Sequence, residues 1–222
     1  MGSLNLLAID TATERCSVAA RINDMWFERT LDTPRGHADI VLTMVDEVLH
    51  ESRIALHELD GIAYGRGPGA FTGVRIAIGV VQGIAFGANL KTFGISNLAA
   101  VAQQVAEPGR KILVCMDARM KEIYWGEFRC DSSGLVEASG IERLSSPDTI
   151  EANDVDVLVG SAAAAYPALA ARFAAVTQIA ALPRAKEIAM LAEREFGAGR
   201  GQSAFDVQPV YLRDQVTFVK TG

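Results

Sequence analysis

The sequence predicts an α/β protein built from two related lobes. The 222-residue chain is 50% hydrophobic, which is enough to bury a sizeable core. Two apolar runs of strand character, at residues 6–20 and 113–127, align at a constant offset and place Asp117 over Asp10. A similar order of strands and helices follows each run, so we expect an internal repeat with a cleft between its halves.

In the first lobe, apolar runs with β-branched residues indicate strands, and apolar residues three and four positions apart indicate helices. Asn23-Asp24 is a natural hairpin turn between the second and third strands. The expected elements are strands at 4–10, 16–22 and 25–31, a helix at 37–51, a strand at 61–65, a helix from about Thr72 with Thr72 as its cap, a short strand at 91–96 and a helix from near Ser96 or Asn97.

The second lobe repeats this pattern from Lys111 onward. The expected elements are a strand at 111–117, a hairpin with its turn at Asp131–Gly134, a short segment at Ser146-Pro147, the strand "VDVLVG" and a helix over "SAAAAYPALAARFA". We place the lobes at residues 1–106 and 107–222 and expect the tail from about residue 205 to pack back against a lobe. Pro209 makes this tail unsuited to a central strand.

Two β-β-β-α-β-α lobes, each with an acid at the end of its first strand, are typical of the actin-like ATPase (ASKHA, ribonuclease H-like) architecture. In such folds the first hairpin of each lobe faces a nucleotide from opposite sides. The candidate residues for a nucleotide or anion cleft are Asp10, Thr11, Thr13, Gly67, Gly69 and Asp117. Acids at strand ends are also common turn and cap residues, so both interpretations stay open.

The loop "GRGPGA" at residues 65–70 satisfies G-x-G-x-x-A between a strand and a helix. A dinucleotide site needs an acid about 20 positions further on, yet residues 61–106 contain no Asp or Glu. A P-loop is excluded because no Lys-Ser or Lys-Thr follows the glycines. A tight turn is the structural alternative, and a helix start with free N–H groups could still hold an anion.

The helix after this loop carries Gly79, Gly83 and Gly87, which recur every four residues and therefore form one ridge without side chains. Each glycine costs about 1 kcal/mol relative to alanine in a helix. Close approach of another backbone would offset that cost. The partner is either a helix of the same lobe or a helix of another chain.

Composition and charge exclude several classes of function. A net charge of −6 disfavours nucleic-acid binding by this chain alone, because phosphate binding depends on clustered Lys and Arg. The three scattered cysteines are typical of buried free thiols in a reducing cytoplasm. The longest apolar stretch carries Arg75 and Gln82, so we expect no membrane span. Three scattered histidines and the lack of a G-x-S-x-G elbow predict no metal site and no catalytic residue.

Four stretches together resemble one family. These are "LLAIDTATERCSVA", "AYGRGPGAFTGVRIAIGVVQGIAFG", "MDARMKEIYWGEF" and "PVYLRD". They closely resemble the TsaB (YeaZ) family of bacterial accessory proteins for making threonylcarbamoyladenosine in tRNA. The resemblance implies an actin-like fold that is inactive alone, and the free thiols and the lack of an expected membrane span predict a cytoplasmic protein. It also implies a heterodimer with the catalytic paralogue TsaD, joined by the ATPase TsaE.

The resemblance further implies where the partner binds. In the family, first-lobe helices build the heterodimer and support a homodimer when TsaD is missing. Carried over to this chain, the partner-interface residues are Ile40, Met44, Val48, Ile76, Gly79, Val80, Gly83 and Gly87. No cofactor is expected to bind tightly, ATP or ADP is expected at the complex interface, and tRNA is expected to bind only through the complex.

Two other functions stay open from the residues. An independent ATP-dependent phosphotransferase or ATPase would use Asp10 and Asp117. A peptidase of the glycoprotease type would need the H-x-x-x-H metal pair of TsaD-like proteins, but Val41 stands four residues after His37.

Overall fold

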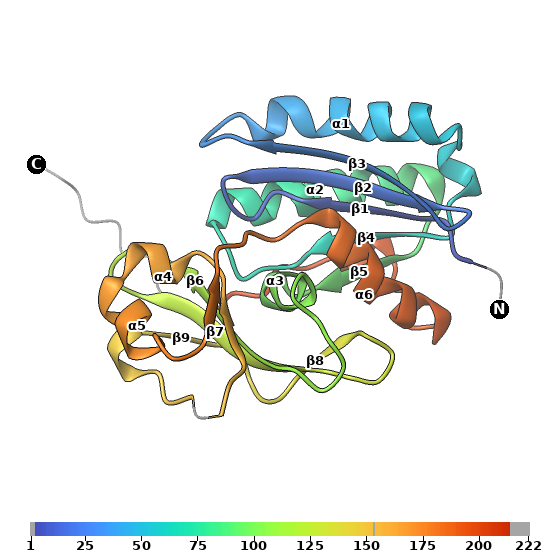
Figure 1. Cartoon of the computed structure of the whole chain (residues 1–222). Helices are drawn as coiled ribbons and strands as arrows, with labels where there is room; N and C mark the ends of the chain where they lie inside the picture. Colours follow the sequence, from blue (N-terminus) through green and yellow to red (C-terminus); the bar gives the residue numbers. More distant parts are fainter. Residues whose placement is uncertain (1–2, 153, 214–222) are drawn as a thin grey trace, which may run out of the picture.

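The computed structural model describes residues 3–152 and 154–213, which form two β-sheets with helices between and outside them (Figure 1). The strand order is β3-β2-β1-β4-β5 in the first sheet and β11-β10-β6-β7-β8 in the second. In each sheet a central strand pairs antiparallel with the next strand in sequence and parallel with a later one. The predicted two-lobed α/β fold is confirmed, and the repeat extends to the strand pairing.

The first sheet contains the predicted hairpin turn. Its strands are β1 (Leu6–Asp10), β2 (Arg15–Ile22), β3 (Met25–Asp32), β4 (Gly61–Gly65) and β5 (Thr92–Ile95). Asn23 and Asp24 join β2 to β3 with φ values of 50° and 66°. Asn and Asp tolerate this left-handed conformation better than other side chains, and the turn matches the twist of the flanking strands.

The second sheet follows the same plan with shorter outer strands. Its strands are β6 (Lys111–Asp117), β7 (Ile123–Cys130), β8 (Val136–Ala138), β9 (Arg143–Ser145), β10 (Val157–Val159) and β11 (Thr177–Ile179). Strand β7 pairs with both β8 and β9. The turn predicted after β7 is present, because Asp131 N donates to Leu135 O at 2.8 Å and Gly134 adopts a φ of 85°.

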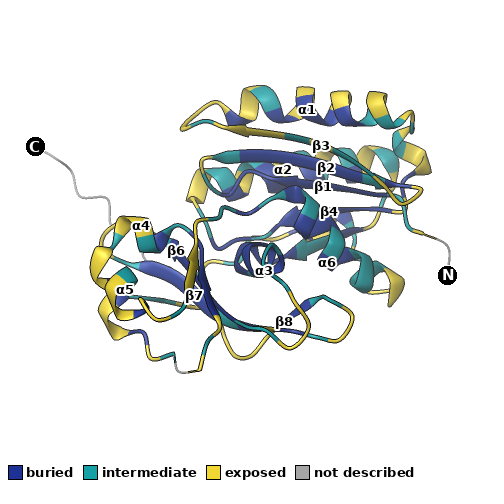
Figure 2. Cartoon of the chain, in the orientation of Figure 1, coloured by how far each residue is buried: buried dark blue, intermediate teal, exposed yellow. Residues whose placement is uncertain are grey.

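The helices form layers around the two sheets. They are α1 (His37–Ser52), α2 (Phe71–Ala88), α3 (Asn97–Gln103), α4 (Ala162–Ala165), α5 (Pro167–Arg172) and α6 (Ala185–Gly197), with the 3₁₀ turns η1 (Leu56–Glu58), η2 (Pro147–Thr149) and η3 (Ala204–Asp206). Helices α1 and α2 cover the outer face of the first sheet, whereas α4 and α5 pack on the second. Helices α3 and α6 lie between the sheets, in the core that Figure 2 shows as buried.

Strand β1 is buried on both faces, which explains its continuous apolar sequence. Leu7 and Ile9 pack in the cluster beneath α1 and α2, while Ala8 packs against the central layer with α3 and α6. Successive side chains of a strand point to opposite faces, so the small alanine faces the crowded central layer. The strand ends at Asp10, so this carboxylate lies at the C-terminal end of the central strand of the first sheet.

The sequence prediction for the segment after β10 was wrong in one respect. "SAAAAYPALAARFA" does not form one helix but the two short helices α4 and α5. Pro167 causes the break, because it lacks an N–H and disfavours helical geometry at Tyr166. Tyr166 accordingly has φ −129° and ψ 87°.

The start of α2 also differs from the prediction, because its cap is Ala70 and not Thr72. Ala70 N donates to the Ala12 carbonyl at 2.7 Å and so docks the loop on the turn after β1. A Cβ at Gly73 would lie 2.1 Å from the Thr11 carbonyl oxygen. Glycine is therefore required where this helix passes over β1.

Helix α6 is an element that sequence reasoning missed, and it returns the chain to the first lobe. Ala185 N donates to Ser17 Oγ of β2 at 3.0 Å. The apolar side of the helix is buried through Ile188, Leu191 and their alanine neighbours. The chain thus crosses from the second sheet back to the first after residue 180.

The segment after α6 runs along the first lobe and reaches the second lobe at Arg213, and residues 214–222 of the predicted tail lie outside the described residues. Gln202 exchanges two backbone hydrogen bonds with Thr92 of β5. Val207 is buried in the cluster beneath α2. Arg213 then reaches the turn between β6 and β7, where its Nη2 donates to Glu122 Oε2 at 2.6 Å.

Candidate partner-binding face and inter-lobe cleft

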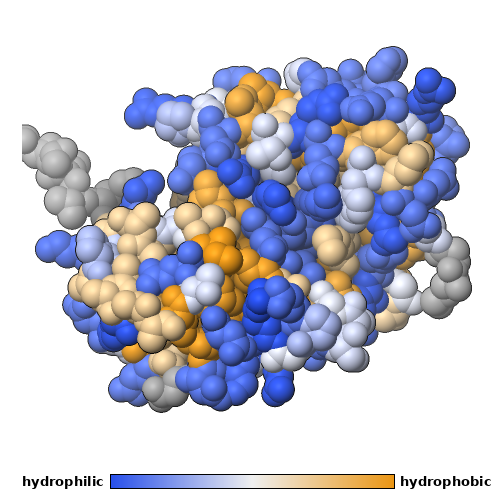
Figure 3. All heavy atoms as spheres, in the orientation of Figure 1, coloured by the Kyte–Doolittle hydropathy of each residue, from blue (hydrophilic) through white to orange (hydrophobic). Residues whose placement is uncertain are grey.

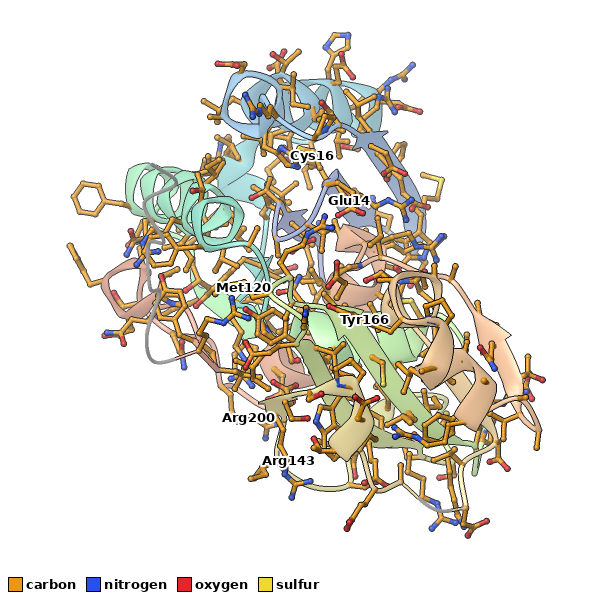
Figure 4. All side chains as sticks on the ribbon, turned by 90° about the vertical axis from the view of Figure 1, so that its left-hand side faces the viewer. Glu14, Cys16, Met120, Arg143, Tyr166 and Arg200 are labelled. Carbon is orange, nitrogen blue, oxygen red and sulfur yellow. The ribbon has the colours of Figure 1, made fainter. Side chains whose placement is uncertain are left out.

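The two lobes enclose a cleft of about 820 Å³. The turn after β1, the end of β6 and helix α4 line it, together with the linker at residues 180–182. Figure 4 looks toward this side of the molecule, with Glu14 on the first lobe and Tyr166 on the second. Figure 3 shows hydrophobic side chains gathered where the lobes meet. We call this cavity the inter-lobe cleft.

Only part of the predicted cleft set lines this cavity. Thr13, Gly69 and Asp117 do so. Asp10, Thr11 and Gly67 do not, and this part of the prediction is corrected. The Thr11 hydroxyl is buried and donates to the Gly73 carbonyl at 2.7 Å, while a Cβ at Gly67 would lie 2.7 Å from the Val210 carbonyl oxygen. The C-terminal segment therefore covers the space beside Gly67.

Asp10 is fully buried and directed toward α3. Its Oδ1 accepts a hydrogen bond from Asn97 Nδ2 at 2.6 Å, and its Oδ2 is buried without a hydrogen-bond partner among the described residues. Burial raises the pKa of Asp10 to about 6, although the bond from Asn97 partly opposes that rise. The carboxylate is a packed group at the strand end and not a cleft ligand.

Asp117 reaches the cleft, but local groups occupy its oxygens. Its Oδ1 accepts from the Tyr166 hydroxyl and from Arg119 N, each at 2.9 Å. Its Oδ2 lies 3.0 Å from Arg119 Nη1. The repeat places Asp10 and Asp117 at equivalent strand ends, but the two carboxylates are hydrogen-bonded to different neighbours, Asp10 to Asn97 and Asp117 to Tyr166 and Arg119.

The cleft has the volume of a nucleotide site but lacks a suitable phosphate cradle. Two arginines line it within the described residues, and neither is free. Arg15 makes a bidentate pair with Asp32 at 2.7 and 2.8 Å, and Arg119 pairs with Asp117. No lysine lines it in this part of the chain. These residues do not fit a triphosphate, and we assign no chemical step to one.

The ridge of Gly79, Gly83 and Gly87 on α2 lies at the molecular surface. A Cβ built on any of the three meets no atom within 4 Å. All three are exposed, whereas Ile76 and Val80 beside them are half-buried. We call these five residues the glycine face. The sequence left two partners open for the ridge, a helix of the same lobe or a helix of another chain. Within the described residues, no helix of this chain packs on it.

Two members of the predicted interface set belong to the core instead. Met44 and Val48 on α1 are buried beneath that helix in the first-lobe cluster, so a partner cannot reach them. Ile40 is half-buried. On α1, the large apolar side chain at the surface is Leu42, which is 55% exposed. The helical spacing of Ile40, Met44 and Val48 was correct, but it marked the buried side.

Four exposed aromatic residues beside the glycine face were missed. Phe71 and Phe86 lie near the two ends of α2, and Phe205 and Tyr211 of the C-terminal segment pair with them. The Phe86 and Phe205 rings meet edge to face at 5.5 Å, and both side chains are more than 60% exposed. The position of Phe71 and Phe86 on one side of α2 was readable from the sequence, whereas their pairing with the C-terminal segment was not.

Helix α2 is strongly apolar although most of its residues are not buried. Its 18 residues have a mean hydropathy of 1.5, and 33% of them are buried. By length and composition alone, such a helix could also cross a membrane. Its inner side packs on the first sheet, so the remaining apolar surface is concentrated on one outward side.

The position of the H-x-x-x-H pair expected of TsaD-like proteins is filled by a core residue. His37 begins α1, and its Nε2 is buried without a hydrogen-bond partner among the described residues. Val41, four residues later, is fully buried in the apolar cluster. Within the described residues, no three His, Cys, Asp or Glu side chains are grouped so that they could hold a metal ion.

The two matched lobes around a central cleft define a protein of the actin-like ATPase class. The sequence model of the family described as "TsaD: tRNA N6-adenosine threonylcarbamoyltransferase" matches residues 32–220. A curated relative from Escherichia coli is 36% identical over 98% of both chains. Another from Haemophilus influenzae is 37% identical over 99% of this chain and 98% of its own. Both are named tRNA threonylcarbamoyladenosine biosynthesis protein TsaB. The chain belongs to the TsaB family.

Solved structures agree with this assignment. YeaZ from Pseudomonas aeruginosa is 36% identical, with a TM-score of 0.83 over 93% of this chain and all of its own. A second P. aeruginosa structure, described as an uncharacterized protein with similarity to peptidase YEAZ, is 36% identical. It has a TM-score of 0.84 over 95% of this chain.

Proposed function

We propose that this chain is a non-catalytic accessory subunit for threonylcarbamoyladenosine modification of tRNA. In this role it binds a TsaD-type transferase through the glycine face and enables that enzyme to act. The names of its relatives supply the pathway. The single observation that carries the partner role is the ridge of Gly79, Gly83 and Gly87, which stands open to solvent on an apolar helix.

The energetics of α2 support a docking role. Three glycines in one helix cost about 1 kcal/mol each relative to alanine, and no contact inside the described chain offsets this cost. A partner helix could approach the bare ridge closely and bury the apolar side chains around it. Exposed aromatic residues at both ends of α2 are of the type that dominates binding energy at protein interfaces.

The local chemistry also supports a role without turnover by the isolated chain. Asp10 is packed against Asn97, and Asp117 is engaged by Tyr166 and Arg119. A peptidase would need an activated nucleophile, but burial raises the pKa of the Cys16 thiol to about 11 and that of Cys115 further. These residues serve structure and leave the chemistry to the partner.

The proposal extends to the other components of the complex. The ATPase TsaE joins after the heterodimer forms, and tRNA binds only to the complex, in keeping with the net charge of −6 of this chain. Any ATP or ADP binds at the joint surface and not in the inter-lobe cleft of this subunit. Without TsaD, the same apolar face supports a homodimer in the cytoplasm.

The test combines binding and activity. The purified chain and the TsaD of its own organism are run alone and together on size exclusion, and tRNA modification is measured with TsaE, ATP and threonylcarbamoyl-adenylate precursors. Gly83→Trp should abolish co-elution and modification. Gly140→Trp is the matched control, because Gly140 in the β8–β9 loop also has open space around its Cβ. Modification by this chain without TsaD, or co-elution unchanged by Gly83→Trp, would refute the proposal.

A further inference from the structure

Arg75 is exposed and is the one charged residue of helix α2. It lies one turn before Gly79 and therefore begins the same row of α2 as Gly79, Gly83 and Gly87. Residues 61–106 contain no Asp or Glu. Within the described residues, Arg75 makes no ion pair within 4.0 Å, and the same is true of other exposed arginines such as Arg129 and Arg143.

Two aromatic rings hold the Arg75 guanidinium in place. Its Cζ lies 3.2 Å from the centroid of the Phe71 ring and 4.9 Å from that of Tyr211. The two rings stack at 5.7 Å with an interplanar angle of 27°. Arg75 Nη1 also donates to the Phe71 carbonyl oxygen at 3.3 Å. A guanidinium ordered in this way has lost rotamer freedom before any partner binds.

Tyr211 belongs to the C-terminal segment, and backbone contacts fix its position. Val210 N donates to the Arg66 carbonyl oxygen at 2.8 Å, directly before Tyr211. Arg213, two residues later, donates to Glu122 and to the Ala118 carbonyl oxygen in the second lobe. The segment is thus anchored on both sides of Tyr211, and Arg75 is positioned by residues far apart in the sequence.

We propose that Arg75 is a recognition anchor for a carboxylate of the protein partner that docks on the glycine face. This inference rests on the proposed function and specifies its partner chemistry: a helix that crosses the ridge and presents an Asp or Glu at the Phe71 end. The planar guanidinium matches a carboxylate through two parallel N–H···O bonds. Burial between the aromatic rings and the partner would strengthen that pair, because water is excluded from it.

The experiment measures affinity for the cognate TsaD by calorimetry at several NaCl concentrations. Arg75→Gln should weaken binding roughly 30-fold, which is about 2 kcal/mol at 1.4 kcal/mol per tenfold, and should flatten the salt dependence. Arg75→Lys should recover only part of the affinity, because it keeps the charge without the planar fork. Arg129→Gln, an exposed cation on β7 in the second lobe, is the charge-matched control and should change neither quantity.

The role of the rings has its own pair of variants. Tyr211→Phe keeps the stacking and should bind like the wild type, whereas Tyr211→Ala should weaken binding in the same direction as Arg75→Gln. The partner carboxylate is then found by replacing surface Asp and Glu residues of TsaD with their amides. One amide variant should lose affinity non-additively with Arg75→Gln.

The possible failures are distinguishable. If the wild-type chain binds TsaD and Arg75→Gln binds equally well with the same salt dependence, the anchor is refuted and the proposed function stands. Additive losses for every TsaD amide variant would also refute the anchor. If the wild-type chain does not bind TsaD at all, the proposed function fails and the anchor fails with it.

Discussion

Asn97 Nδ2 donates a hydrogen bond of 2.6 Å to Oδ1 of Asp10, and this contact ties the end of β1 to the first residue of α3. The same Asn97 accepts from Gly67 N at 2.8 Å through its Oδ1. A Cβ at Gly65 would lie 2.0 Å from Asp10 Oδ1, so only glycine fits beneath the pair. In an actin-like fold, an acid at the end of this strand would face a nucleotide. Asp10 is instead buried and hydrogen-bonded within the first lobe.

Asp10 should make stability depend on pH. Its pKa is about 6 in the folded chain and close to 3.8 when unfolded, so the folded state holds the proton more tightly. The stabilisation from this proton is fully present below pH 3.8 and is lost as the pH rises through 6. At about 1.4 kcal/mol per pKa unit, the loss is of the order of 3 kcal/mol.

Urea unfolding of the wild type and Asp10→Asn from pH 4 to 7.5 measures this effect. The Asn variant does not titrate, so the difference between the two curves should grow toward neutral pH and level off above pH 6. The pKa of Asp32 is lowered by its hydrogen bond from Arg15, so its effect on stability runs the other way: the stabilisation from Asp32 is lost as the pH falls. Parallel curves for Asp10→Asn and wild type would contradict the assignment.

Alanine substitutions at two glycines of α2 should have opposite effects. Gly83→Ala should raise the free energy of unfolding by about 1 kcal/mol, because alanine is the better helix former and its Cβ meets no atom within 4 Å. Gly73→Ala should destabilise the chain, because its Cβ would lie 2.1 Å from the Thr11 carbonyl oxygen. Denaturant unfolding checks both, and a destabilised Gly83→Ala would show that the ridge is packed inside the chain.

Ser96 should contribute to stability in two ways. Its Oγ accepts from Leu98 N at 3.1 Å and from Ala99 N at 3.3 Å as the cap of α3, and it donates to Glu142 of the second lobe. Ser96→Ala should lower the free energy of unfolding by about 1 kcal/mol for the cap and by up to about 1 kcal/mol more for the partly buried Glu142 carboxylate left without this donor. Burial raises the pKa of Glu142, so protonation of the variant should recover part of the second loss at low pH.

Chemical unfolding at neutral and acidic pH tests the Ser96 prediction. Ser203→Ala is the control, because Ser203 caps only the single turn η3 through one bond to Phe205 N. It should cost less than Ser96→Ala. Equal losses for the two variants would show that the contact with Glu142 contributes nothing.

The three thiols should be unreactive in the folded chain. Cys16, Cys115 and Cys130 are buried and free, and burial raises the pKa of each thiol. At pH 8 in native buffer, a thiol reagent such as dithiobisnitrobenzoate should react slowly, and in denaturant it should titrate three equivalents. Rapid reaction of one equivalent in native buffer would indicate an accessible thiol.

Local sequence signals predicted several elements because nearby residues determine them. The turn at Asn23-Asp24 follows from left-handed dihedrals that these side chains tolerate, and the start of α3 follows from the capping hydroxyl of Ser96. Helix α6 was missed although the helical spacing of its apolar residues was present in the sequence, whereas nothing in the sequence indicated which sheet it would cover. Its docking on β2 through Ser17 depends on residues far apart in the sequence.

The sequence by itself determined the two-lobed α/β repeat, the family and the bare ridge on α2, because each depends on residue type and spacing along the chain. Tertiary structure alone decided which predicted residues are accessible. Burial removed Val48 from the interface and Asp10 from the cleft, while the C-terminal segment placed Tyr211 beside Arg75. The spacing of apolar residues shows that they share one side of a helix. It does not show whether that side faces the core or a partner, because exposure depends on contacts between segments far apart in the sequence.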